Sequence, residues 1–144
     1  MRVLATIVAC AAVLCGCTTA GRSYIADVDG GTWSGPVTLT VPNSDTLGLY
    51  DMSIALRHDG GHVGEKVAMT VRTVTPDSLC IEESLTVVLA GDGRSRSVRH
   101  EMMCPYRRSV RFAREGDYRI IITPKRPVSG VTAVGVDMSQ SAQR

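Results

Sequence analysis

The chain has 144 residues, with 16 Lys and Arg against 14 Asp and Glu, which gives a net charge of +2. This length is sufficient for one domain with a hydrophobic core. The near-neutral charge argues against nucleic acid as a partner, because nucleic-acid binding needs a strongly basic face. Aromatic residues make up only 4% of the chain, too few for an extended platform on which bases or sugars could stack.

The N-terminus has the pattern of a bacterial lipoprotein precursor. Met1-Arg2 is a short positive segment, and residues 3–13 form an apolar run that is long enough for a signal peptide. The run is shorter than the roughly 20 residues that span a bilayer. The next four residues, Leu-Cys-Gly-Cys, match a lipobox, in which small residues precede the cysteine that accepts diacylglycerol. The pattern predicts cleavage after Gly16 and lipid attachment to Cys17, a membrane tether of two or three acyl chains.

The three N-terminal cysteines allow two alternatives to a lipobox. Cys10, Cys15 and Cys17 could build a redox or metal site, but such a site needs a polar, folded context and this run is apolar. The apolar run could also remain as an uncleaved anchor. The lipoprotein interpretation divides the chain into a signal peptide over 1–16, a lipidated tether over 17–23, a folded domain over 24–138 and a disordered polar tail over 139–144.

The mature chain is a series of short alternating apolar segments separated by turn residues, without a helical period. Seven to eight strands at this spacing predict an all-β fold, an antiparallel β-sandwich of immunoglobulin or jelly-roll type. The expected strands are, in chain order, 37–41, 49–58, 66–74, 79–90 as one strand or two, 97–103, 106–112, 117–123 and 131–138. Alternation predicts that the following side chains face the core: Tyr50, Met52, Ile54, Leu56, Val67, Met69, Val71, Tyr118, Ile120, Ile122, Val134, Val136 and Met138.

The sequence offers little catalytic chemistry. His58-Asp59-Gly60-Gly61-His62 has metal-ligating side chains, but its glycines and its place between two strands favour a hairpin loop over a zinc site. No G-x-S-x-G elbow is present for a serine nucleophile. Glu82 and Glu83 point to opposite faces of a strand and are badly placed for acid–base work. We therefore expect no catalytic residues, no metal and no cofactor.

A local concentration of arginine lies between Gly91 and Gly116. It is either an anion- or partner-binding surface or the solvated outer face of two paired strands, where arginine keeps an edge soluble. The residues assigned to a candidate interaction surface are Trp33, Arg94, Arg96, Arg107, Arg108 and Arg111.

Two cysteines remain in the mature chain besides Cys17. Cys80 and Cys104 each lie in or beside an expected strand. In an oxidising compartment they could form a disulfide worth about 3 kcal/mol through loop entropy. The alternative is two free cysteines that act as small apolar residues.

Several short motifs follow one another through the mature domain. They are Tyr24 with Gly31-Thr32-Trp33, then 49–57, Val74-Thr75-Pro76-Asp77, 108–112 with Gly116 and Tyr118, and Gly130-Val131 with Val134-Gly135-Val136. Their order resembles the gliding motility-associated lipoprotein family GldH of the Bacteroidetes, and the resemblance covers essentially the whole mature domain. It implies a non-enzymatic accessory lipoprotein of the cell envelope, with motility or secretion proteins as partners and no catalytic residues.

The expected function is therefore that of a lipid-anchored envelope protein that acts through protein–protein contacts. The alternative is a lipoprotein that binds a carbohydrate or small ligand through exposed aromatic side chains. No acidic residue follows Cys17 before Asp27. Surface lipoproteins of the Bacteroidetes tend to carry acids there, so we expect an outer-membrane protein that faces the periplasm.

Overall fold

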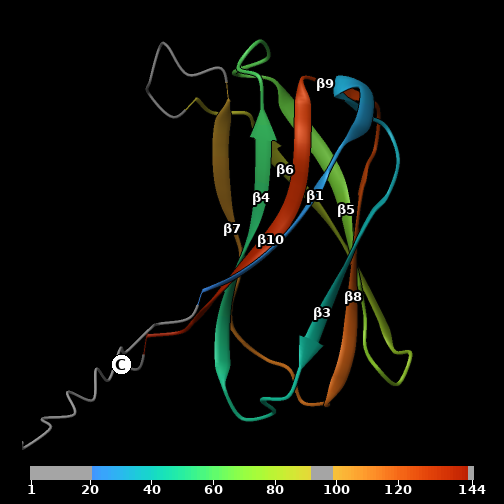
Figure 1. Cartoon of the computed structure of the whole chain (residues 1–144), viewed down its shortest axis with the longest axis vertical. Helices are drawn as coiled ribbons and strands as arrows, with labels where there is room; N and C mark the ends of the chain where they lie inside the picture. The colour runs from blue at the N-terminus through green and yellow to red at the C-terminus, as the bar shows by residue number, and fades with distance from the viewer. Residues whose placement is uncertain (1–20, 92–98, 143–144) are drawn as a thin grey trace, which may run out of the picture.

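The structure, a computed structural model, describes residues 21–91 and 99–142. In these residues it is an antiparallel β-sandwich of two four-stranded sheets, with a short two-stranded pair at one end (Figure 1). The elements are β1 (Arg22–Asp27), the 3-10 turn η1 (Asp29–Gly31), β2 (Thr32–Trp33), β3 (Val37–Asn43), β4 (Leu49–His58), β5 (Lys66–Val74), β6 (Cys80–Val88), β7 (His100–Arg111), β8 (Gly116–Pro124), β9 (Val128–Ser129) and β10 (Val131–Gln140).

The strand order identifies the sandwich as a jelly roll. One sheet has the order β1-β10-β4-β7 and the other β3-β8-β5-β6, and every pair is antiparallel. When the eight long strands are numbered along the chain, the sheets contain strands 1, 8, 3, 6 and 2, 7, 4, 5. This is the arrangement that two Greek keys produce. The fold-class prediction is confirmed, and of its two types the jelly roll is the one present.

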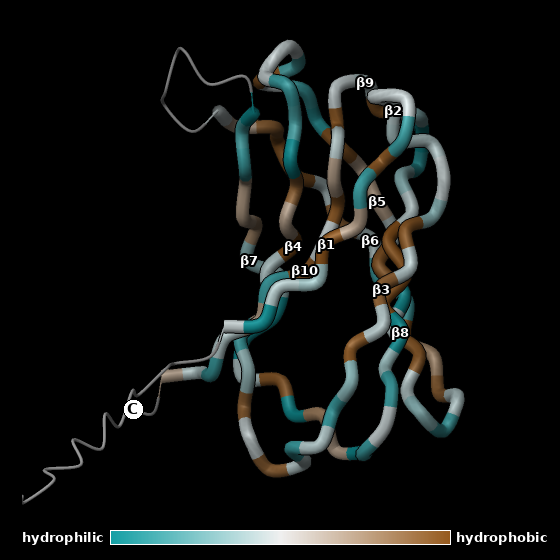
Figure 2. The backbone as a smooth tube through the Cα atoms, in the orientation of Figure 1, coloured by the Kyte–Doolittle hydropathy of each residue, from teal (hydrophilic) through white to brown (hydrophobic). Residues whose placement is uncertain are grey.

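The core lies between the two sheets and contains all the side chains that alternation assigned to it, together with others such as Trp33, Leu39 and Phe112. Figure 2 shows hydrophobic and hydrophilic residues alternating along the strands. Ile54, Met69, Ile120, Ile122 and Val136 are fully buried, and the other predicted inward residues are buried with them. No buried side-chain nitrogen or oxygen in the described residues lacks a hydrogen-bond partner.

The chain departs from the expected strands in several places, and the strands β1, β2 and β9 are not among the expected ones. The two segments predicted around Pro105 are one strand, β7, because it is an edge strand and an edge tolerates proline. The predicted tether overlaps β1, which begins at Arg22, and the predicted tail overlaps β10, which ends at Gln140. Ser141 also belongs to the fold, because its N–H donates to the Leu49 carbonyl oxygen at 2.9 Å. The segment 79–90 contains one strand, β6.

Within residues 21–91 and 99–142, no helix is long and apolar enough to cross a bilayer. The predicted signal peptide and Cys17 lie outside the described residues.

Candidate functional site

The C-terminal half of β7 is irregular, and two hollows meet there. In the β4–β7 ladder Tyr50 pairs with Val110 and Met52 with Arg107, so Asp51 alone faces two residues of β7. Ser109 adopts a positive φ of 54°, and its N–H donates to Asp51 Oδ1 at 2.9 Å. Such a bulge bends a strand and re-aims its side chains. Arg107 lines the first of these hollows, Arg111 lines the second, and Arg108 lines both.

The first hollow is a cleft of about 320 Å³ between the edges of β6 and β7. Glu83 of β6 and Tyr106 of β7 span it, because the Tyr106 hydroxyl donates to the Glu83 carboxylate at 2.5 Å. Arg107 donates to the other oxygen of the same carboxylate, and its guanidinium carbon lies 5.6 Å from the centre of the Tyr106 ring. We call these three residues the β6–β7 clasp. The cleft is lined by Met52, Thr73, Ile81, Glu83, Tyr106, Arg107, Arg108, Ser109, Val110 and Phe112.

The clasp shifts the ionisation of its members. The hydrogen bond from Tyr106, and then that from Arg107, lowers the pKa of Glu83, because both stabilise the charged carboxylate. Burial, followed by the hydrogen bond to Glu83, raises the pKa of Tyr106 to about 12. Near neutral pH the clasp therefore holds an ionised carboxylate, a neutral phenol and a guanidinium, so it contains one compensated ion pair.

The second hollow is an open groove of about 910 Å³ at the end of the β1-β10-β4-β7 sheet. Arg108 and Arg111 lie along it beside two exposed leucines, Leu47 at 79% and Leu49 at 42% exposure. Asp51, which also lines the groove, accepts hydrogen bonds from the Ser109 N–H and from the Ser141 hydroxyl, the latter at 2.7 Å. The hydrogen bond from Ser141, then that from Ser109, lowers the pKa of Asp51. The groove combines positive charge, an ordered carboxylate and accessible apolar surface.

The structure places only some of the predicted interaction-surface residues at a hollow of the surface. Arg107, Arg108 and Arg111 do line hollows on one strand, whereas Arg94 and Arg96 lie outside the described residues. The prediction is wrong for Trp33. Its side chain is 1% exposed and its Nε1 donates to the Gly35 carbonyl oxygen at 2.9 Å, because the β2–β9 pair carries it into the core.

The aromatic side chains do not form an exposed platform. Tyr50, Tyr118 and Phe112 are buried, with Phe112 packed edge-on against both tyrosines. Tyr24 and Tyr106 are half-buried. The alternative of sugar binding through exposed rings receives no support from these positions.

Cys80 and Cys104 are free thiols and do not form the candidate disulfide. Cys80 lies on the outer face of β6, where Arg72 Nε donates to its sulfur at 2.9 Å. Cys104 points inward from β7 and packs against the core. The two sulfurs thus lie on different sheets and on faces of opposite sense. Burial raises the pKa of Cys104.

The histidine segment forms the connection between β4 and β5, where a hairpin loop was predicted. His58 is buried, with Nε2 2.8 Å from the Ala90 carbonyl oxygen. Its Nδ1 accepts the Gly60 N–H at 3.1 Å, so both ring nitrogens are occupied. His62 instead pairs with Glu65. The described residues contain no group of three or more His, Cys, Asp or Glu side chains that could hold a metal.

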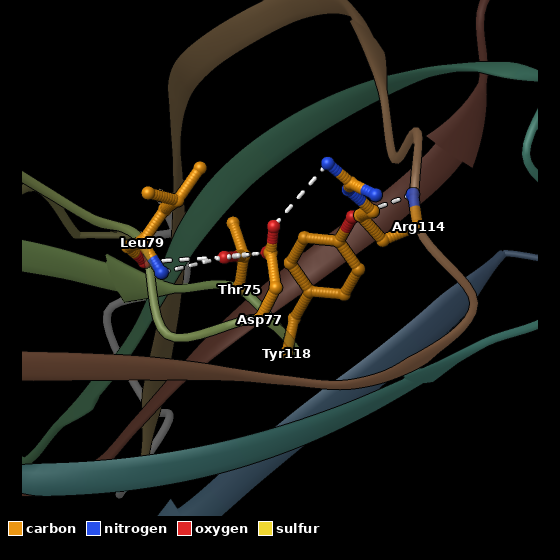
Figure 3. Close-up of polar contacts among 5 residues, drawn as sticks. All are labelled: Thr75, Asp77, Leu79, Arg114 and Tyr118. Atoms are coloured by element: carbon orange, nitrogen blue, oxygen red, sulfur yellow. Dashed lines mark hydrogen bonds and ion pairs between the residues drawn. The ribbon is translucent and has the colours of Figure 1, made fainter.

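Residues far apart in sequence meet beside the turn between β5 and β6, toward the opposite end of the sandwich from β9 (Figure 1). Figure 3 shows their contacts. Asp77, in the turn between β5 and β6, lies 3.3 Å from the Arg114 guanidinium. The Arg114 N–H donates to the Tyr118 hydroxyl at 3.1 Å. Thr75 closes its own turn, because its hydroxyl accepts the Leu79 N–H at 2.9 Å and donates to Asp77 at 2.6 Å. Two of the segments that carry the family resemblance therefore pack together.

No protein-family model and no curated protein sequence matches the chain. Among the solved structures that are distantly similar, two are from infectious bursal disease virus. The Gx-strain structure has 14% identity and a TM-score of 0.37 and is matched over 84% of this chain and 32% of its own. The VP2 subviral particle has 12% identity and a TM-score of 0.32 over 84% and 33%. This chain spans about a third of either length, and at these scores the similarity carries no functional inference.

Proposed function

We propose that the protein is a lipoprotein of the bacterial cell envelope, anchored through Cys17, that acts by binding other proteins. The lipobox ending at Cys17 is the observation that carries the proposal. A GldH-like accessory role in motility or secretion is the more specific form, and it rests on the motif order alone. We place the protein in the outer membrane, facing the periplasm, because the residues that follow Cys17 are not acidic.

The fold gives the tether a short reach. β1 begins at Arg22, five residues after Cys17, and five extended residues span at most about 18 Å. The N-terminal residue of β1, Arg22, pairs with Met138, close to the Gln140 and Leu49 end of the sheet. A protein anchored at Cys17 would therefore hold the second hollow near the membrane, where it could meet other envelope proteins.

The anchor is tested by metabolic labelling with a palmitate analogue in the native host. We expect the wild-type chain and the control variant Cys15→Ala to be labelled and to sediment with membranes. Cys17→Ala should lose both the label and the membrane fraction. A label that persists in Cys17→Ala would refute the assignment of this thiol. Protease treatment of intact cells tests the orientation, since removal of the domain would show that it faces outward.

The contact surface is tested by affinity capture after cross-linking in cells. We expect the tagged protein to enrich envelope proteins, and Arg108→Glu with Arg111→Glu to reduce that enrichment while the membrane fraction stays unchanged. Arg119→Glu, on the outer face of the other sheet, is a charge-reversal control away from the groove that should leave capture intact. Equal capture by all three proteins would exclude this groove as the contact surface.

A further inference from the structure

The four edge strands of the sandwich differ in how well they are protected from further pairing. β1 and β3 contact each other along one side. β7 carries Pro105 and the bulge at Ser109, two devices that discourage pairing at an edge. β6 has neither: its nine residues pair with β5 without a register shift and contain no proline or glycine. β6 is thus the long, regular edge in the described part of the chain.

Backbone hydrogen bonds show which residues of β6 direct their N–H and C=O groups toward β5 and which direct them toward the free edge of the sheet. The Leu89 N–H donates to the Glu65 carbonyl oxygen at 2.9 Å, and the Leu79 carbonyl oxygen accepts the Thr75 N–H at 2.9 Å. The odd-numbered residues of this ladder therefore point toward β5, since hydrogen-bonded residues alternate in an antiparallel pair. The even-numbered residues point to the free edge, and within 21–91 and 99–142 no other strand takes their groups. These residues are Cys80, Glu82, Ser84, Thr86 and Val88.

We propose that this edge pairs antiparallel with β6 of a second copy, with the two-fold axis at Ser84, so that two four-stranded sheets join into one. In this register Ser84 faces Ser84, Glu82 faces Thr86, and Cys80 faces Val88 of the second copy. All five outward residues then exchange both backbone hydrogen bonds. An axis at Glu82 or at Glu83 would place two carboxylates directly opposite each other, which is destabilising.

The side chains of β6 fit this arrangement. Ile81 and Val88 are 58% and 51% exposed, and the pairing would set them against Val87 and Cys80 of the second copy. An inward charge on an edge strand normally opposes pairing. Glu83 is the inward charge here, but Tyr106 and Arg107 of its own chain already hold it. The pairing therefore leaves the Glu83 carboxylate with its partners.

Cross-linking of full-length protein in detergent tests the register. The parent variant is Cys80→Ser, which lacks the exposed thiol. Cross-linking of this parent measures any dimer formed through the other cysteines. Added to it, Ser84→Cys should give a covalent dimer with a short bismaleimide, because the two sites face each other across the axis. Thr86→Cys should not give this dimer. Residue 86 of one copy would face residue 82 of the second, so the two residues 86 would lie four positions apart, about 14 Å. Equal cross-linking of both variants, or none above background, would overturn the register.

Sedimentation equilibrium of the full-length chain tests the association itself. We expect a dimer for the wild type and for Ser84→Thr, and a monomer for Ser84→Pro. The Ser84 N–H points away from β5, so proline removes only the bond to the second copy and the strand can accept it. An unchanged circular dichroism spectrum would show that the fold is intact. A monomeric wild type, or a Ser84→Pro variant that remains dimeric with an intact fold, would overturn the proposal.

Discussion

The β6–β7 clasp makes a quantitative prediction about how the open side of the sandwich is closed. Glu83 and Tyr106 are on different sheets, and their hydrogen bond is 2.5 Å long. Hydrogen bonds to charged groups contribute about 1.5–3 kcal/mol when they are well shielded. The Glu83 side chain is 36% exposed, so solvent screening reduces that value. We expect a coupling free energy of about 1 kcal/mol between these two side chains at neutral pH.

The assay is a double-mutant cycle in urea, with Glu83→Ala, Tyr106→Phe and the double variant. Each single change should lower the free energy of unfolding, and the double variant should lose about 1 kcal/mol less than the sum of the two. Glu82→Ala serves as the control, since Glu82 lies next along the strand but on its outer face. Its cycle with Tyr106→Phe should show no coupling.

The pH dependence of the cycle gives an independent check. The pKa of Glu83 is lowered in the folded protein, so the folded state favours the ionised carboxylate more than the unfolded state does. The stabilisation is thus fully present above the unfolded value of about 4.5 and is lost as pH falls through the folded pKa. Coupling below about 0.3 kcal/mol at pH 7, or coupling that does not fall in acid, would refute the charge-assisted clasp.

Three further predictions concern the core, the close packing of strands and the thiols. Ile120→Ala should destabilise the protein by about 2–5 kcal/mol in urea unfolding because Ile120 is fully buried, whereas Ile121→Ala on the outer face should cost clearly less. Gly135→Ala should lower the melting temperature, because a Cβ there would lie 2.3 Å from a β1 carbonyl oxygen; an unchanged melting temperature would show that β1 yields freely. Cys80 should react with a maleimide in the native protein and Cys104 mainly after unfolding, so mass spectrometry that finds neither thiol free would restore the disulfide.

Alternation alone predicted the fold class and most of the core. In β4 and β8 every second residue is apolar and most positions between them carry polar or small side chains, so the inward face could be assigned without knowing the sheet order. The same rule could have excluded the disulfide. Leu85 and Val87 alternate with the polar residues Ser84 and Thr86 along β6, which gives the inward phase of the strand, and Cys80 then falls on the outward face.

The clasp could not be predicted, because periodicity assigns a residue to a face but does not tell which edges adjoin. Glu83 and Tyr106 meet only because a jelly roll brings β6 and β7 to the same side of the sandwich. The prediction that Trp33 lies on the interaction surface was wrong for a related reason. It lies in a two-residue strand that pairs with residues almost a hundred positions later, and no local pattern marks such a pair.

The two features of β6, the clasp formed by Glu83 and the free backbone edge, are related by strand geometry. The clasp uses an odd-numbered side chain, Glu83, which points into the sandwich, while the free backbone groups belong to the even-numbered residues. The two sheets are therefore joined between β6 and β7 by side chains, and the backbone groups at the edge of β6 remain free to pair with another strand. If the clasp were replaced by backbone pairing between β6 and β7, the two sheets would join at this side and neither strand would keep a free edge. A charged clasp is the arrangement that stabilises the monomer and still permits a second strand to add to β6.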